Sequence, residues 1–104
     1  MNTDRITSTL VELCEIPSPS RCERPVADYI LSRISTLGLD AIEDNAGDDI
    51  DGDTGNIIVR VDGKSSSSLL LTAHMDTVMP AGGLPERINV KITDGVVHTD
   101  QNSI

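Results

Sequence analysis

The sequence predicts an α/β fold in which two amino-terminal helices precede a small mixed sheet and a C-terminal hairpin. Apolar residues recur at helical spacing up to residue 38, whereas short β-branched and apolar runs dominate after residue 56. An Asp- and Gly-rich stretch over residues 44–56 separates the two parts and is typical of an exposed loop. The 104 residues suffice for one small domain or for part of a larger one.

The first helix is predicted from Ile6, Leu10 and Leu13, which recur at helical spacing. The run Ile16-Pro17-Ser18-Pro19 follows. Each proline removes a backbone donor and restricts the residue before it, so we expect this helix to end near Glu15.

The second helix is predicted to begin within residues 21–24 and to end at Gly38, a C′ glycine. Ser20 and Glu23 have the spacing of a capping box, and Pro25 is compatible only with the first turn. The apolar stripe of this helix consists of Val26, Tyr29, Ile30, Ile34 and Leu37.

Part of the acidic loop resembles a calcium-binding loop, because Asp49, Asp51 and Asp53 alternate as the first ligands of such a loop do. However, the glycine stands at Gly52, and Arg60 occupies the position where such a loop has its glutamate. We therefore predict a solvated acidic turn.

The strands are predicted over residues 57–61 and 69–73, and the second, a continuous apolar run, is expected to be buried on both faces of the sheet. Apolar and polar residues alternate over 88–92. Asp94-Gly95 suits a two-residue turn from this strand into residues 96–98, which indicates a hairpin.

Net charge and composition disfavour some classes of binding partner and some locations in the cell. The formal net charge of -9 disfavours nucleic acid and anionic membranes, and no apolar run approaches the roughly 20 residues that cross a bilayer. The first fifteen residues include four charged residues, which disfavours a signal peptide, so we expect a cytoplasmic protein. Cys14 and Cys22 are read as reduced thiols, and the single aromatic residue, Tyr29, indicates a thin core.

The main candidate for chemistry is His74-Met75-Asp76-Thr77-Val78, directly after the predicted strand over 69–73. Sites in open α/β sheets gather at the carboxyl ends of strands. An imidazole is a common zinc ligand, and a nearby carboxylate can orient the ring or a catalytic base. The two-residue spacing alone is a weak signal, because such a histidine is more often structural. His98, the other histidine, fits no motif and is expected at the surface.

Residues 69–78 resemble the first metal-site signature of the co-catalytic zinc exopeptidases, which include peptidase T, related aminopeptidases and carboxypeptidases, and deacetylases. Other segments resemble this family in the same order: Leu13–Ser20, Val26–Ile30, Leu37–Leu39 and Gly55–Ile58. The chain is most similar to the peptidase T-like branch, because residues 78–81 are followed by a short link and a hairpin that ends in residues 100–104.

This resemblance implies that residues 1–104 are the amino-terminal part of a three-layer α/β/α catalytic domain in a di-zinc aminopeptidase that hydrolyses short peptides. His74 would bind one zinc ion, and Asp76 would be a catalytic-site carboxylate that orients a zinc-binding or basic group. The family's metal-bridging aspartate, its glutamates and its second zinc-binding histidine match no position here. We therefore expect the fragment alone to be inactive.

Two alternatives remain open. The complete protein could be a deacylase or carboxypeptidase of the same family, or this chain could be a non-catalytic folding or interaction module. The expected partner is a short peptide substrate, and we also expect self-association of the fragment or a homodimer of the full protein. No role is assigned to the remaining candidate acids, Glu12, Glu15, Glu23 and Glu43.

Overall fold

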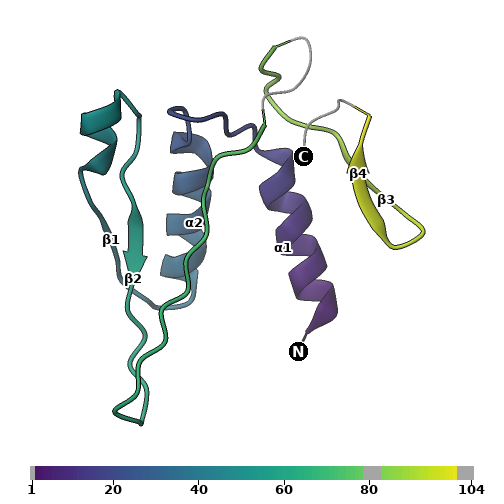
Figure 1. The fold of residues 1–104 in the computed structure, drawn as a ribbon. Coiled ribbons are helices and arrows are strands. Elements are labelled where there is room, and N and C mark those ends of the chain that lie inside the picture. Colours follow the sequence, from purple (N-terminus) through teal and green to yellow (C-terminus); the bar gives the residue numbers. More distant parts are fainter. Residues whose placement is uncertain (1, 79–82, 101–104) are drawn as a thin grey trace.

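The computed structural model describes residues 2–78 and 83–100, over which the chain forms two α-helices and two separate two-stranded sheets (Figure 1). The α/β class, with two amino-terminal helices and a C-terminal hairpin, is confirmed. The α-helices and strands, in chain order, are α1 (Thr3–Glu15), α2 (Arg24–Thr36), β1 (Ala41–Glu43), β2 (Ile57–Val59), β3 (Val90–Thr93) and β4 (Val96–Thr99). Helix α1 contacts β3, and α2 contacts β1.

Helix α1 ends at Glu15, as the following prolines predict. At its start, the side chain of Asn2 accepts a hydrogen bond from the Arg5 backbone N–H at 3.0 Å. This cap satisfies one of the first-turn N–H groups that has no partner within the helix.

Helix α2 has the predicted Pro25 in its first turn and Gly38, with φ 71°, just after its end. The predicted capping box is wrong. Glu23 is the N-cap residue and makes no side-chain cap, because its carboxylate instead accepts from the Arg21 N–H at 2.9 Å. Ser20 therefore lies outside the helix and is available for another partner.

Strands β1 and β2 form an antiparallel pair in which Ile42 faces Ile58. The sequence did not predict β1, and β2 covers only the first part of the expected strand over 57–61. Between the two strands, the acidic loop contains a short 3-10 helix, η1 (Ala46–Ile50). A fork between the Arg24 guanidinium and the Glu43 carboxylate, with distances of 2.8 and 3.1 Å, joins α2 to this sheet.

Strands β3 and β4 form the predicted hairpin, with Thr93 opposite Val96. The two turn residues, Asp94 and Gly95, have φ angles of 52° and 77°. Both angles are positive, as the two-residue turn that suits the twist of a hairpin requires.

The predicted strand over residues 69–73 is not formed, and the strands that do form are not joined in one mixed sheet. Its leucines, Leu69, Leu70 and Leu71, are each 83% exposed instead of buried. Residues 69–73 make no backbone hydrogen bond to another described residue. A strand is stabilised by ladder bonds and cross-strand side-chain pairs, and no described strand supplies them here.

The core is small, as the composition predicts. Its buried aliphatic side chains, apart from the prolines of the turn between the helices, include Val26, Ala27 and Ile88, which are 4%, 0% and 2% exposed. The Ile88 N–H donates to the Glu15 carbonyl at 2.9 Å, which fixes the segment before β3 against the end of α1. In the described part of the chain, no helix is both long and apolar enough to cross a membrane.

Candidate functional site

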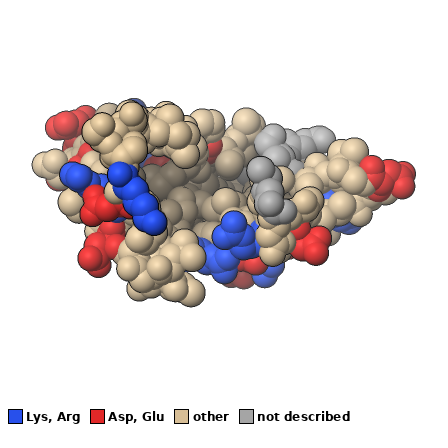
Figure 2. All heavy atoms as spheres, turned by 90° about the horizontal axis from the view of Figure 1, so that it is seen from below, with Lys and Arg blue, Asp and Glu red and all other residues tan. Residues whose placement is uncertain are grey.

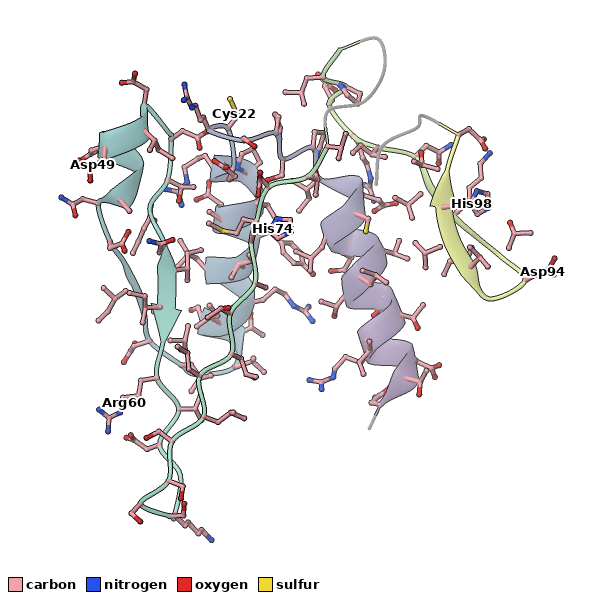
Figure 3. The ribbon with its side chains drawn as sticks, in the orientation of Figure 1. Cys22, Asp49, Arg60, His74, Asp94 and His98 are labelled. Carbon is pink, nitrogen blue, oxygen red and sulfur yellow. The ribbon has the colours of Figure 1, made fainter. Side chains whose placement is uncertain are left out.

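The candidate site lies on the extended segment formed by residues 71–76, which runs beside α2 (Figure 3). This segment, strand β2 and the side chains of Ile30 and Ile34 from α2 line a groove of about 750 Å³. From below, the molecule shows a hollow lined mainly by uncharged side chains, with charged groups around it (Figure 2). The groove brings the end of the extended segment and the free edge of β2 to one surface.

His74 and Asp76 interact directly. His74 Nδ1 lies 2.9 Å from Asp76 Oδ1, while the His74 side chain is 84% exposed and the Asp76 side chain is 39% exposed. The structure thus brings together the two residues of the predicted motif, and it leaves the imidazole accessible.

Hydrogen bonding to the charged form keeps the Asp76 carboxylate ionised. The Ser20 hydroxyl donates to Asp76 Oδ2 at 2.5 Å, and this bond, followed by the one from His74, holds the pKa of Asp76 below its usual value. An ionised carboxylate only accepts hydrogen bonds, so Nδ1 of a neutral His74 carries the ring proton. The lone pair of Nε2 is then directed away from Asp76 and can bind a metal ion.

A turn between the helices holds the site segment. The Thr77 N–H donates to the Ser18 carbonyl at 2.7 Å, and Pro17, Ser18 and Pro19 are buried. The sequence analysis did not identify Ser20 as a site residue, since its apparent partner was Glu23, three positions away. Its partner Asp76 is 56 positions away, and no local pattern indicates such a distant pair.

His74 fits a zinc ligand in chemistry and in accessibility. Among residues 2–78 and 83–100, no group of at least three His, Cys, Asp or Glu side chains is arranged to hold a metal ion. A catalytic zinc takes about three protein ligands, so the described residues do not form a whole zinc site, and the roles of His74 and Asp76 stay predictions.

The other candidates belong to different parts of the molecule. His98 lies on β4, separate from His74, and its Nε2 is 2.9 Å from the Thr93 hydroxyl (Figure 3). Cys14 is partly buried, which raises the pKa of its thiol, and Cys22 is exposed; both are free cysteines.

The candidate acids have structural partners. Glu12 accepts a hydrogen bond from the Tyr29 hydroxyl at 2.5 Å, and Glu15 pairs with Arg87. Glu43 pairs with Arg24 and also accepts from the Gly55 N–H at 3.1 Å; these bonds, with one from Thr54, lower the pKa of Glu43 to about 2.

The carboxylates of the acidic loop accept hydrogen bonds both within the loop and from helix α2. Asp53 accepts from the Arg24 N–H at 2.9 Å. Asp44 accepts from the backbone N–H groups of Ala46 and Asn56 and from the Asn56 side chain, which lowers the pKa of Asp44. These contacts organise the loop between β1 and β2.

Comparison with known proteins gives two partial matches. The chain is 30% identical over 105 residues to the uncharacterized protein YqjE of Bacillus subtilis; the match spans all of this chain and 27% of that protein. It is 32% identical over 91 residues to succinyl-diaminopimelate desuccinylase of Corynebacterium glutamicum, spanning 88% of this chain and 23% of the enzyme. The chain thus spans about a quarter of the length of these curated relatives.

No known family profile and no solved structure matches the chain. The similarity to the desuccinylase supports at most a distant relation to the metallopeptidase family. It does not extend to peptidase T or to aminopeptidase activity.

Proposed function

We propose that these 104 residues are the amino-terminal part of a zinc-dependent hydrolase that cleaves short peptides, as a peptidase T-like aminopeptidase does. The observation that carries the proposal is the hydrogen bond between His74 Nδ1 and Asp76 Oδ1 at 2.9 Å. This bond leaves Nε2 of an exposed imidazole free for a metal ion. Fixing a zinc-binding histidine through its second nitrogen is how proteins commonly orient such a ligand.

In this proposal, His74 binds one of two zinc ions, and Asp76 holds its ring and its tautomer. The bound metal would supply the chemistry of peptide hydrolysis by polarising the scissile carbonyl and lowering the pKa of a bound water. The remaining ligands and the general base belong to the rest of the complete protein. The 104-residue chain alone is therefore expected to show no peptidase activity.

The second candidate is a deacylase, which removes an acyl group from an amino acid. It is favoured by the 32% identity to succinyl-diaminopimelate desuccinylase, a protein whose name assigns it a desuccinylation. Both candidate reactions hydrolyse an amide bond, so His74 and Asp76 would have the same roles in each.

The test uses a protein that carries residues 1–104 together with the complete metal site. Zinc-loaded protein is incubated with tripeptides and, separately, with N-succinyl amino acids, and the products are identified by mass spectrometry. Release of an amino-terminal residue, abolished by a chelator, is the expected result. Release of succinate would favour the deacylase, and no turnover of either substrate by zinc-loaded protein would contradict both candidates.

A further inference from the structure

Asp76 has both carboxylate oxygens engaged by side chains from different parts of the chain. Oδ1 lies 2.9 Å from His74 Nδ1, and Oδ2 accepts the Ser20 hydroxyl at 2.5 Å. The three side chains form one line of hydrogen bonds that begins in the turn between the helices and ends at the imidazole.

We propose that Ser20 is a positioning residue that fixes the Asp76 carboxylate and, through it, the tautomer and orientation of His74. This inference rests on the proposed function, in which His74 is a metal ligand. A carboxylate held at one oxygen only can rotate about its side-chain bonds, and the Asp76 side chain is 39% exposed. The bond to Ser20 removes that freedom and presents Oδ1 to Nδ1.

The turn that carries Ser20 is itself fixed to the site segment. The Ser18 carbonyl accepts from both the backbone N–H and the hydroxyl of Thr77, at 2.7 and 3.4 Å. Ser20 is thus anchored on the same segment that carries its acceptor. Because the helix begins at Arg24, Ser20 makes no helix cap that would compete for its hydroxyl.

Ser18 offers a matched comparison within this turn. It is 2% exposed, and its hydroxyl has no hydrogen-bond partner among the described residues. Replacing Ser18 with alanine removes a hydroxyl from the turn without touching Asp76. Because Ser18 is buried, an effect of Ser18→Ala would report disturbed packing of the turn rather than loss of the bond to Asp76.

The tautomer of His74 can be measured in the metal-free 104-residue chain from the ¹⁵N shifts of the ring at about pH 8, where an ordinary imidazole is neutral. The His98 signals are assigned with a His98→Ala variant. A net hydrogen bond of ordinary strength corresponds to a change of roughly threefold to tenfold in the ratio of the two tautomers. We expect Ser20→Ala to lower the ratio of the Nδ1–H tautomer to the Nε2–H tautomer by this factor.

Ser20→Thr, which keeps the hydroxyl, should restore the wild-type ratio, and Ser18→Ala should leave it unchanged. The Thr77 amide signal, which reports its bond to Ser18, shows whether the turn is intact in each variant. An unchanged ratio in Ser20→Ala would overturn the proposal, as would an equal change in Ser18→Ala or a failure of Ser20→Thr to restore it. None of these outcomes concerns zinc binding by His74, which is measured separately in the complete protein.

Discussion

The hairpin β3–β4 and the run over residues 69–73 were both predicted to form strands, but only the hairpin does so. The hairpin pairs each strand with a neighbour reached through Asp94 and Gly95. The 69–76 segment is more apolar, yet Leu69, Leu70 and Leu71 are exposed and residues 69–73 belong to no described sheet. The segment that formed no strand is the one that carries His74 and Asp76.

The difference shows that apolar content alone does not make a strand. Asp94-Gly95 lets the chain turn back at once, so β3 finds its partner at small entropic cost. Residues 71–73 line the same groove as β2, and no described strand pairs with residues 69–73. A strand here would need a partner from outside the described residues.

The largest effect is expected when alanine substitutions of the two histidines, His74 and His98, are compared. His74→Ala in the complete protein should abolish zinc-dependent hydrolysis and lower the zinc content, because it removes a direct ligand. His98→Ala, in the hairpin, should change neither. Elemental analysis and hydrolysis rates on the same samples make the comparison, and full zinc occupancy with normal rates in His74→Ala would refute the ligand assignment.

A smaller effect is expected from Asp76→Asn, which keeps the shape of the side chain and removes its charge. Changes in groups that orient metal ligands typically cost about 10- to 100-fold in metal affinity or activity. Asp94→Asn in the hairpin turn is the control, since asparagine also tolerates a positive φ. Equal rates for wild type and Asp76→Asn would reduce Asp76 to a structural turn residue.

Self-association tests the exposure of the 69–71 leucines. We expect the 104-residue chain to associate, and Leu70→Lys to reduce this, because a charge on an unpaired edge disfavours pairing with another chain. Val96→Lys places the same charge on the hairpin, where Val96 is 61% exposed, and should have little influence. Sedimentation velocity measures the association state of each variant. A wild-type chain that sediments as a monomer and unfolds cooperatively on heating would contradict the prediction.

Turn geometry can be tested with alanine. Gly95→Ala should lower the free energy of unfolding by about 1–2 kcal/mol, because Gly95 has a φ of 77° that disfavours a side chain. An added Cβ at Gly95 or at Gly63 meets no atom within 4 Å. Gly63→Ala, before the 69–76 segment, should therefore be neutral or slightly stabilising in the same denaturant titration.

The ion pair between Arg24 and Glu43 joins α2 to the β1–β2 sheet, so the stability of the chain should depend on pH. The pKa of Glu43 falls from 4.5 to about 2 in the folded chain. The folded state binds this proton less readily than the unfolded state, so the contribution of Glu43 is present above pH 4.5 and is lost as the pH falls toward about 2. Glu43→Gln should flatten the acid limb of the stability curve, whereas Glu86→Gln, at an exposed carboxylate, should leave its shape unchanged.

Local signals predicted the parts of the fold whose causes are local. Prolines after Glu15 ended α1, Gly38 ended α2, and Asp94-Gly95 formed a turn. The three-residue β1 has too few residues for a recognisable pattern. The apolar run over 69–73 predicted a strand, but such a run does not reveal whether a partner strand is present.

In the candidate site, too, the residues with local sequence signals were predicted and the residue that depends on distant contacts was not. His74 and Asp76 were predicted from their place after the apolar run and from the resemblance of residues 69–78 to a metal-site signature. The structure places them in contact, and their roles remain predictions. Ser20 was assigned to Glu23 because a local rule connects these positions. The actual bond to Asp76 depends on how the chain folds over 56 residues, which one sequence does not reveal.

The left-handed conformation of Arg21, with φ 73°, suggests a trade-off between stability and precision. A residue with a Cβ is disfavoured there by roughly 1–2 kcal/mol, yet its backbone is held on both sides. Its N–H donates to Glu23, and its carbonyl accepts from the Asp53 N–H at 3.2 Å. A glycine at this position would relieve the strain and also widen the range of shapes open to the turn beside Ser20. Arginine thus restricts the turn to fewer conformations than glycine would, and the strained backbone lowers the stability of the folded chain.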